Sequence, residues 1–218
     1  AYKDIDTWHK VALEEAEGHI YSRNTNPTVR AFEDKVKELE SAQAATSFAS
    51  GMAAISNTLA TFLKPGDRVV SIKDSYGGTN VIFNEFLPPL NIIVSLCETG
   101  DYEQIEAEIA KGCTLLYLET PTNPTIKITD IKRLSAAAKK VGALVVVDNT
   151  FATPINQNPL LLGADITLHS ASKYLGKENN ACTFFVAACP ARAWLLFQWR
   201  YPFGFQKRHG REGGQVAG

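Results

Sequence analysis

The sequence has 218 residues, of which 45% are hydrophobic, 21% charged and 10% aromatic, and its formal net charge is -1. This balance excludes global disorder, which needs low hydrophobicity and high net charge, and it gives no electrostatic signal for nucleic acid or a membrane surface. No apolar run approaches the ~18 residues that a membrane-spanning helix needs. The N-terminal AYKDIDTWHK also lacks the apolar centre of a signal peptide.

Cysteine and histidine usage argues against a disulfide scaffold and against a metal site. The four cysteines form no C-x-x-C pair, none has zinc-finger spacing to a histidine, and the four histidines are scattered. We therefore expect reduced thiols in a cytoplasmic protein without a metal ion. The cysteines are Cys97, Cys113, Cys182 and Cys189.

The first part of the chain predicts an arm followed by two helices. Residues 1–20 are expected to form a polar arm or a short helix, and residues 21–28 are rich in turn formers. Thr28 is a plausible N-cap for an amphipathic helix that extends to Leu39. A second helix is predicted to open at Ser50-Gly51 and to end at Pro65-Gly66.

From residue 68 onward, apolar strands alternate with helix patterns. This alternation predicts an α/β fold with a mostly parallel sheet covered by helices on both faces. Ligands bind such sheets at the carboxyl ends of the strands, which directs attention to residues 74–76, 119–123, 148–150 and 169–173. The predicted strands are 68–72, 91–96, 114–119, 143–147 and 165–168, and the predicted helices lie within 76–86, 102–110 and 130–141.

A carboxylate and a lysine are expected at the same edge of this sheet. The buried strand Val145-Val146-Val147 runs directly into Asp148, and a carboxylate there is costly unless a cation meets it. Lys173 follows the next predicted strand, in HSASKYLG. The pair could form a structural salt bridge, or it could serve chemistry.

Other residues nearby favour chemistry. Ser170 and Ser172 flank the lysine, and Gly51 and Met52 begin a helix whose N–H groups can bind an anion. With the aromatic side chain of Tyr76, these groups are what pyridoxal phosphate requires: a lysine that binds it covalently, a carboxylate for the pyridine nitrogen, a phosphate cup and a stacking ring.

At this point the sequence resembles a known family. Six segments resemble, in order, the motifs of the pyridoxal-phosphate enzymes of cysteine and methionine metabolism, which include cystathionine γ-synthase, cystathionine γ-lyase and methionine γ-lyase. The resemblance covers roughly residues 20–176 and implies the aminotransferase-like (fold type I) large domain. The motifs are YSRNTNPT, SGMAA, DSYGGT, ETPTNPT, VVVDNTF and HSASKYLG.

The resemblance also implies roles for individual residues. Lys173 would carry the cofactor, Asp148 would pair with the pyridine nitrogen, and Tyr76 would stack on the ring and help to move protons. Asn123 would lie near the phenolic oxygen of the ring. Glu119 would support the site rather than react in it. The phosphate would be held by Gly51, Met52, Ser170 and Ser172, and by Tyr21 and Arg23 from the neighbouring subunit of a homodimer or a dimer of dimers.

The last 42 residues depart from the family pattern. Lys177-Glu178 stands where the family usually has glycine and histidine, and the charge changes from -5 over residues 1–176 to +4 over residues 177–218. The division expected is an arm (1–20), the large domain (21–176) and a tail (177–218) that is frame-shifted, misread or truncated. The family's arginine for the substrate carboxylate has no counterpart that can be matched there.

The activity implied is γ-elimination or γ-replacement on a sulfur amino acid or an activated homoserine. Within the family, a methionine γ-lyase, a cystathionine β-lyase or an O-acetylhomoserine sulfhydrylase is the alternative. Gly78 stands where methionine γ-lyases tend to carry a cysteine, which makes that activity less expected. Outside the family, the alternatives are an aminotransferase and an inactive cofactor-binding fragment.

Overall fold

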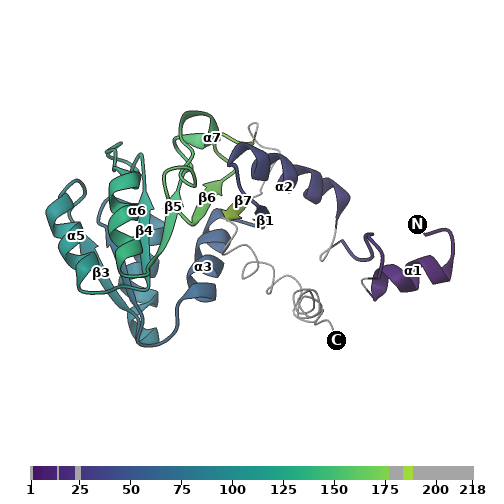
Figure 1. Cartoon of the computed structure of the whole chain (residues 1–218), viewed down its shortest axis with the longest axis horizontal. Helices are drawn as coiled ribbons and strands as arrows, with labels where there is room; N and C mark the ends of the chain where they lie inside the picture. The colour runs from purple at the N-terminus through teal and green to yellow at the C-terminus, as the bar shows by residue number, and fades with distance from the viewer. Residues whose placement is uncertain (1, 14, 23–25, 177–183, 189–218) are drawn as a thin grey trace, which may run out of the picture.

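A seven-stranded sheet forms the centre of the structure (Figure 1). The structure is a computed structural model that describes residues 2–13, 15–22, 26–176 and 184–188. The strand order is β1-β7-β6-β5-β4-β2-β3, and β7 is antiparallel to both of its neighbours whereas the other pairs are parallel. The strands are β1 (Ala44–Phe48), β2 (Arg68–Ile72), β3 (Ile93–Cys97), β4 (Leu115–Glu119), β5 (Leu144–Asp148), β6 (Ile166–Ser170) and β7 (Phe184–Ala188).

Helices cover both faces of this sheet, as the sequence predicted. Side chains of α3 (Gly51–Phe62), together with Phe83, pack on one face, and side chains of α5 (Tyr102–Ala110) and α6 (Ile131–Lys140) pack on the other. Each face is buried because the strands are apolar at nearly every position, which is typical of parallel sheets. The remaining helical segments are α1 (Ile5–Ala12), α2 (Pro27–Leu39), α4 (Gly77–Val81), η1 (Ile82–Phe86), η2 (Pro88–Leu90) and α7 (Thr153–Asn156).

The start of α2 differs from the prediction. The N-cap is Asn26, whose side-chain oxygen accepts hydrogen bonds from the backbone N–H groups of Thr28 at 2.9 Å and Val29 at 3.3 Å. Thr28 therefore lies inside the helix and is not its cap. The reason is Pro27, which lacks an N–H group and has a backbone angle that suits the first position of a helix.

Two strands were not predicted. β1 is a short segment that follows α2, and β7 lies in the tail, where the sequence shows no strand period. Both belong to the antiparallel end of the sheet, where β7 fits between β1 and β6. Long-range pairing of this kind leaves little local pattern, because strand propensity depends strongly on the neighbours that a strand meets.

The N-terminal segment extends away from the sheet (Figure 1). α1 is capped by Asp4, whose side chain accepts from the backbone N–H of Thr7 at 2.6 Å. The hydroxyl of Tyr2 donates to the backbone carbonyl of His19 at 3.0 Å and closes the arm on itself. Among the described residues, we find no helix with the length and apolar character needed to cross a membrane.

Candidate active site

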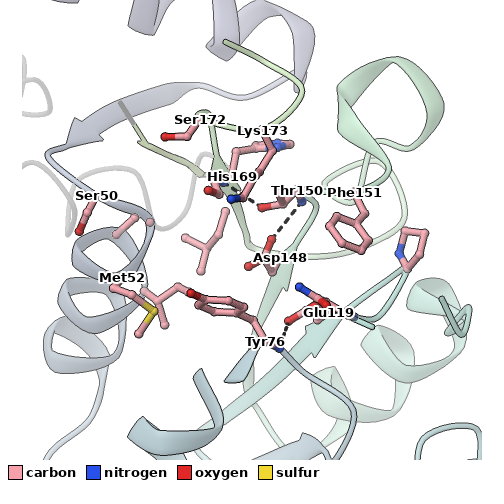
Figure 2. A pocket seen from close by; sticks show the side chains of 17 residues that line it. Ser50, Met52, Tyr76, Glu119, Asp148, Thr150, Phe151, His169, Ser172 and Lys173 are labelled. Atoms are coloured by element: carbon pink, nitrogen blue, oxygen red, sulfur yellow. Dashed lines mark hydrogen bonds between the residues drawn. The ribbon is translucent and has the colours of Figure 1, made fainter. Parts of the chain in front are cut away.

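A cavity of about 320 Å³ opens at the carboxyl ends of β4, β5 and β6, beside the N-terminus of α3 (Figure 2). Eight of the ten residues predicted for the site line it, and they come from five separate segments of the chain. In Figure 2, Asp148 lies between Lys173 and Tyr76. The eight are Gly51, Met52, Tyr76, Asn123, Asp148, Ser170, Ser172 and Lys173.

The other two predicted residues are not among those that line the cavity. Tyr21 lies between α1 and α2 and is 54% exposed. Arg23 lies outside the described residues. Their predicted contact with a neighbouring subunit stays a prediction.

Asp148 is a buried carboxylate at the last position of β5. Its Oδ1 accepts the backbone N–H of Thr150 at 3.0 Å, and the side chain is only 8% exposed. Burial raises the pKa of Asp148, whereas the hydrogen bonds from Thr150 and the nearby His169 act to lower it. In the part of the chain that the structure describes, Asp148 and Lys173 form no salt bridge. The structural salt bridge that the sequence left open for this pair is therefore absent.

Glu119 occupies the equivalent position on the adjacent strand and pairs with Asp148 across β4 and β5. Its two oxygens accept the backbone N–H groups of Tyr76 at 2.7 Å and Asn123 at 2.9 Å. Burial, followed by repulsion from Asp148, raises the pKa of Glu119 to about 7. Glu119 thus joins the loop that carries the Tyr76 ring to the loop that carries Asn123, and its supporting role stays a prediction.

The N-terminus of α3 faces the cavity with free helix N–H groups. Ser50 is the N-cap, and its hydroxyl accepts from the backbone N–H of Ala53 at 3.0 Å. The first N–H groups of a helix have no partner within the helix, so Gly51 and Met52 can donate to an anion. Ser170 and Ser172 line the same cavity.

The sequence reasoning missed several residues of the cavity wall. Thr150 both donates to Asp148 and accepts the backbone N–H of Ser170 at 2.8 Å, so it joins the loops that follow β5 and β6. Phe151 lines the cavity and packs edge-on against Tyr174 with 6.1 Å between ring centroids. Both lie within three residues after Asp148 in the VVVDNTF segment, so their sequence position was the available signal.

Comparisons with known proteins decide the family. The family model for Cys/Met metabolism PLP-dependent enzymes matches residues 1–193. The chain belongs to this family. The cofactor of the family is pyridoxal phosphate (PLP), as the sequence predicted. The match continues past residue 176, where the motif resemblance ends.

Individual relatives agree with this assignment. The chain is 46% identical over 176 residues to the cystathionine gamma-lyase of Bacillus subtilis, an alignment that covers 81% of this chain and 46% of that protein. It is 47% identical over 172 residues to an L-methionine gamma-lyase of Fusobacterium nucleatum, which covers 78% and 43%. The chain spans less than half the length of these curated relatives.

Solved structures confirm the fold. The cystathionine gamma-lyase of Lactobacillus plantarum, crystallised with L-serine, superimposes with a TM-score of 0.80 at 37% identity, covering 86% of this chain and 49% of that one. The metB structure from Corynebacterium glutamicum gives the same TM-score at 36% identity. The predicted aminotransferase-like large domain is therefore confirmed.

Proposed function

We propose that the chain supplies the cofactor-binding part of an enzyme that performs γ-elimination or γ-replacement on sulfur amino acids or activated homoserine. The observation that carries this proposal is the cavity itself, in which Asp148 and Lys173 lie without forming a salt bridge with each other. A lysine and a buried carboxylate in one pocket are the two groups that PLP chemistry requires.

The residues present fit the cofactor. Asp148 and Glu119 are two buried carboxyl groups on adjacent strands, and the pKa of each is raised because burial disfavours the charge. A cation at this position relieves both, and a protonated pyridine nitrogen is such a cation. The charge pattern therefore favours a ligand whose positive end meets Asp148.

The opposite end of the cavity suits a phosphate group. We assign phosphate binding to the backbone N–H groups of Gly51 and Met52 and to the hydroxyls of Ser170 and Ser172. The helix dipole and the free backbone N–H groups at the start of α3 favour the binding of a dianion. Tyr76 supplies the aromatic face, and Asn123 would donate its side-chain amide to an oxygen of the ring.

Lys173 is assigned two tasks. Its Nζ would hold the cofactor, and its amine would carry protons to and from the carbon atoms of the substrate. When bound, PLP withdraws electrons from the α-carbon of an amino acid and so makes the loss of its proton feasible. Tyr76 lines the same cavity and would assist these proton transfers.

The proposed assembly is a homodimer or a dimer of dimers in the cytoplasm, with residues 1–20 as an arm, 21–176 as the large domain and 177–218 as a tail that departs from the motif pattern, although its residues 184–188 form strand β7 of the sheet. Tyr21 precedes α2 on a segment outside the cavity, which supports a contact with the phosphate of a neighbouring subunit. Mixing Lys173→Ala chains with Arg23→Ala chains should restore activity, since one hybrid site keeps both residues. Absence of recovery in hybrids shown to form would count against a shared site.

Turnover assays on candidate substrates identify the substrate. We expect release of a thiol and ammonia, with formation of a keto acid, from cystathionine, or replacement on an O-acylhomoserine. Release of methanethiol from methionine would identify the methionine γ-lyase alternative, which the Fusobacterium relative supports. Keto acid without ammonia would identify an aminotransferase, and binding of PLP without any turnover would identify an inactive fragment.

A further inference from the structure

A buried polar network adjoins the cavity at the carboxyl ends of β4, β5 and β6. It consists of Glu40, Thr120, Asn149, Gln157 and His169, which we call the strand-end network. Four of these residues are at most 2% exposed, and Gln157 is half-buried. Asn149 is fully buried and is not among the residues that line the cavity, whereas His169 both lines the cavity and contacts Glu40. None of the motif roles described above uses this network.

Glu40 joins Asn149 and His169 within the network. It follows the last residue of α2, and its Oε1 accepts from Asn149 Nδ2 at 3.1 Å and contacts His169 Nε2. Oε1 is the acceptor for the Asn149 amide, and its contact with Nε2 joins the imidazole ring to the same carboxyl group. Glu40 is separated from His169 by 129 residues in the sequence, so the contact is made only in the folded chain.

The network continues to a third strand. Asn149 Nδ2 also donates to the carbonyl of Gln157 at 2.9 Å, and Gln157 Nε2 donates to Asn149 Oδ1 at 2.8 Å. The same Nε2 donates to the carbonyl of Thr120 at 2.9 Å. The strand-end network therefore joins the ends of β4, β5 and β6.

Residues at or next to these strand ends line the cavity. Thr120 follows Glu119, Asn149 lies between Asp148 and Thr150, and His169 precedes the segment that contains Lys173. Any shift of the network side chains would move the backbone on which Asp148 and Lys173 are mounted. A displacement of about 1 Å at such groups is enough to weaken binding and turnover.

Stability alone does not account for the network. Glu40 Oε2 and His169 Nδ1 are buried and have no hydrogen-bond partner among the described residues. Each unpaired atom costs free energy, and a buried carboxylate–histidine pair is at best weakly stabilising compared with packed apolar side chains. A costly group at the junction of three strand ends is consistent with a positional role.

We propose that Glu40 is a positioning residue that, through Asn149 and His169, fixes the spacing between Asp148 and Lys173 and so sets the affinity for PLP. This inference rests on the cofactor site proposed above. It concerns a residue outside the six motifs, directly after a helix that does not line the cavity.

Two readouts on the purified protein test it. The first is backbone hydrogen exchange, followed by mass spectrometry, in peptides that cover 148–150 and 169–173 of the cofactor-free protein. The second is the dissociation constant for added PLP, measured from the visible absorption of the bound cofactor. The variants are Glu40→Ala, Glu40→Gln, which keeps an acceptor oxygen, and Ser71→Ala. Ser71 is a fully buried control on β2 whose hydroxyl donates to the carbonyl of Tyr117 at 2.9 Å, away from the network.

We expect Glu40→Ala to speed exchange in both peptides and to weaken PLP binding about tenfold or more, because it removes the buried acceptor of the Asn149 amide and the contact with His169. Glu40→Gln should restore most of both. Ser71→Ala should lower the melting temperature without changing either readout. Should Glu40→Ala fail to fold, the half-buried Gln157→Ala removes the link to Thr120 and should change both readouts in the same direction.

Three results would overturn the proposal: parental exchange and affinity in a folded Glu40→Ala, faster exchange with parental affinity, or an equal loss of affinity in Ser71→Ala. A parent protein that binds no PLP would instead refute the proposed function. The exchange readout would then still show whether the network holds the strand ends.

Discussion

Gly78 offers a sharp test of the role of Tyr76, because its neighbour Gly77 supplies a matched control. A Cβ atom added at Gly78 would lie 2.7 Å from Met52 Sδ and 2.8 Å from Tyr76 Cε1. Ordinary contacts between such atoms are about 3.5–4.0 Å, so both side chains would have to move by roughly 1 Å. At Gly77 the added atom would meet nothing within 4 Å.

The Gly78→Ala variant should therefore displace the ring while the fold persists. We expect kcat/KM to fall by roughly 10²-fold, as for a 1 Å misplacement of a catalytic group, and PLP affinity to fall by about 2- to 10-fold through weakened aromatic stacking. Gly77→Ala should behave like the parent, or be stabilised by up to about 1 kcal/mol. The assays are steady-state turnover, PLP titration and thermal unfolding. Parental values for Gly78→Ala would show that the Met52 and Tyr76 side chains accommodate the added methyl group, and would refute the predicted displacement of the ring.

Three further predictions concern the charged groups of the cavity. Borohydride reduction of the PLP-loaded protein and peptide mapping should place the pyridoxyl group on Lys173, and a label on another lysine would contradict the assignment. Asp148→Asn should retain bound PLP but slow turnover by roughly 10²-fold or more, since it removes a buried charge, and near-normal turnover would count against its role. The raised pKa of Glu119, about 7, means that the folded cofactor-free protein binds a proton that the unfolded chain has released. Stability should therefore fall by up to about 3 kcal/mol between pH ~4.5 and ~7. In Glu119→Gln this decline of stability with pH should be smaller. Identical pH profiles of the two proteins in urea unfolding would show that folding does not raise the pKa of Glu119.

Much of the fold could be predicted because its parallel part carries local signals. The strand 68–72 and the helix 102–110 were predicted with the bounds found, and the other strands from β3 to β6 were shifted by one or two residues. Alternation of apolar strands and amphipathic helices is a property of neighbouring residues and is visible in the sequence. The antiparallel end was missed because β1 and β7 are 136 residues apart in the sequence at the pair Phe48 and Phe184, and only the folded chain brings such strands into register.

The same distinction explains which parts of the site could be found. Asp148 and Lys173 were predicted because topology alone places the carboxyl ends of parallel strands at one edge, and each residue directly follows or lies close to its strand. Glu40 gave no such signal, because a glutamate at the end of an amphipathic helix is ordinarily a solvated charge. The role of Glu40 can be inferred only from its burial against Asn149 and His169, and that burial depends on how α2 packs in the folded chain. Groups that face the ligand can thus be inferred from topology, whereas the groups that hold them in place become visible only in the packed structure.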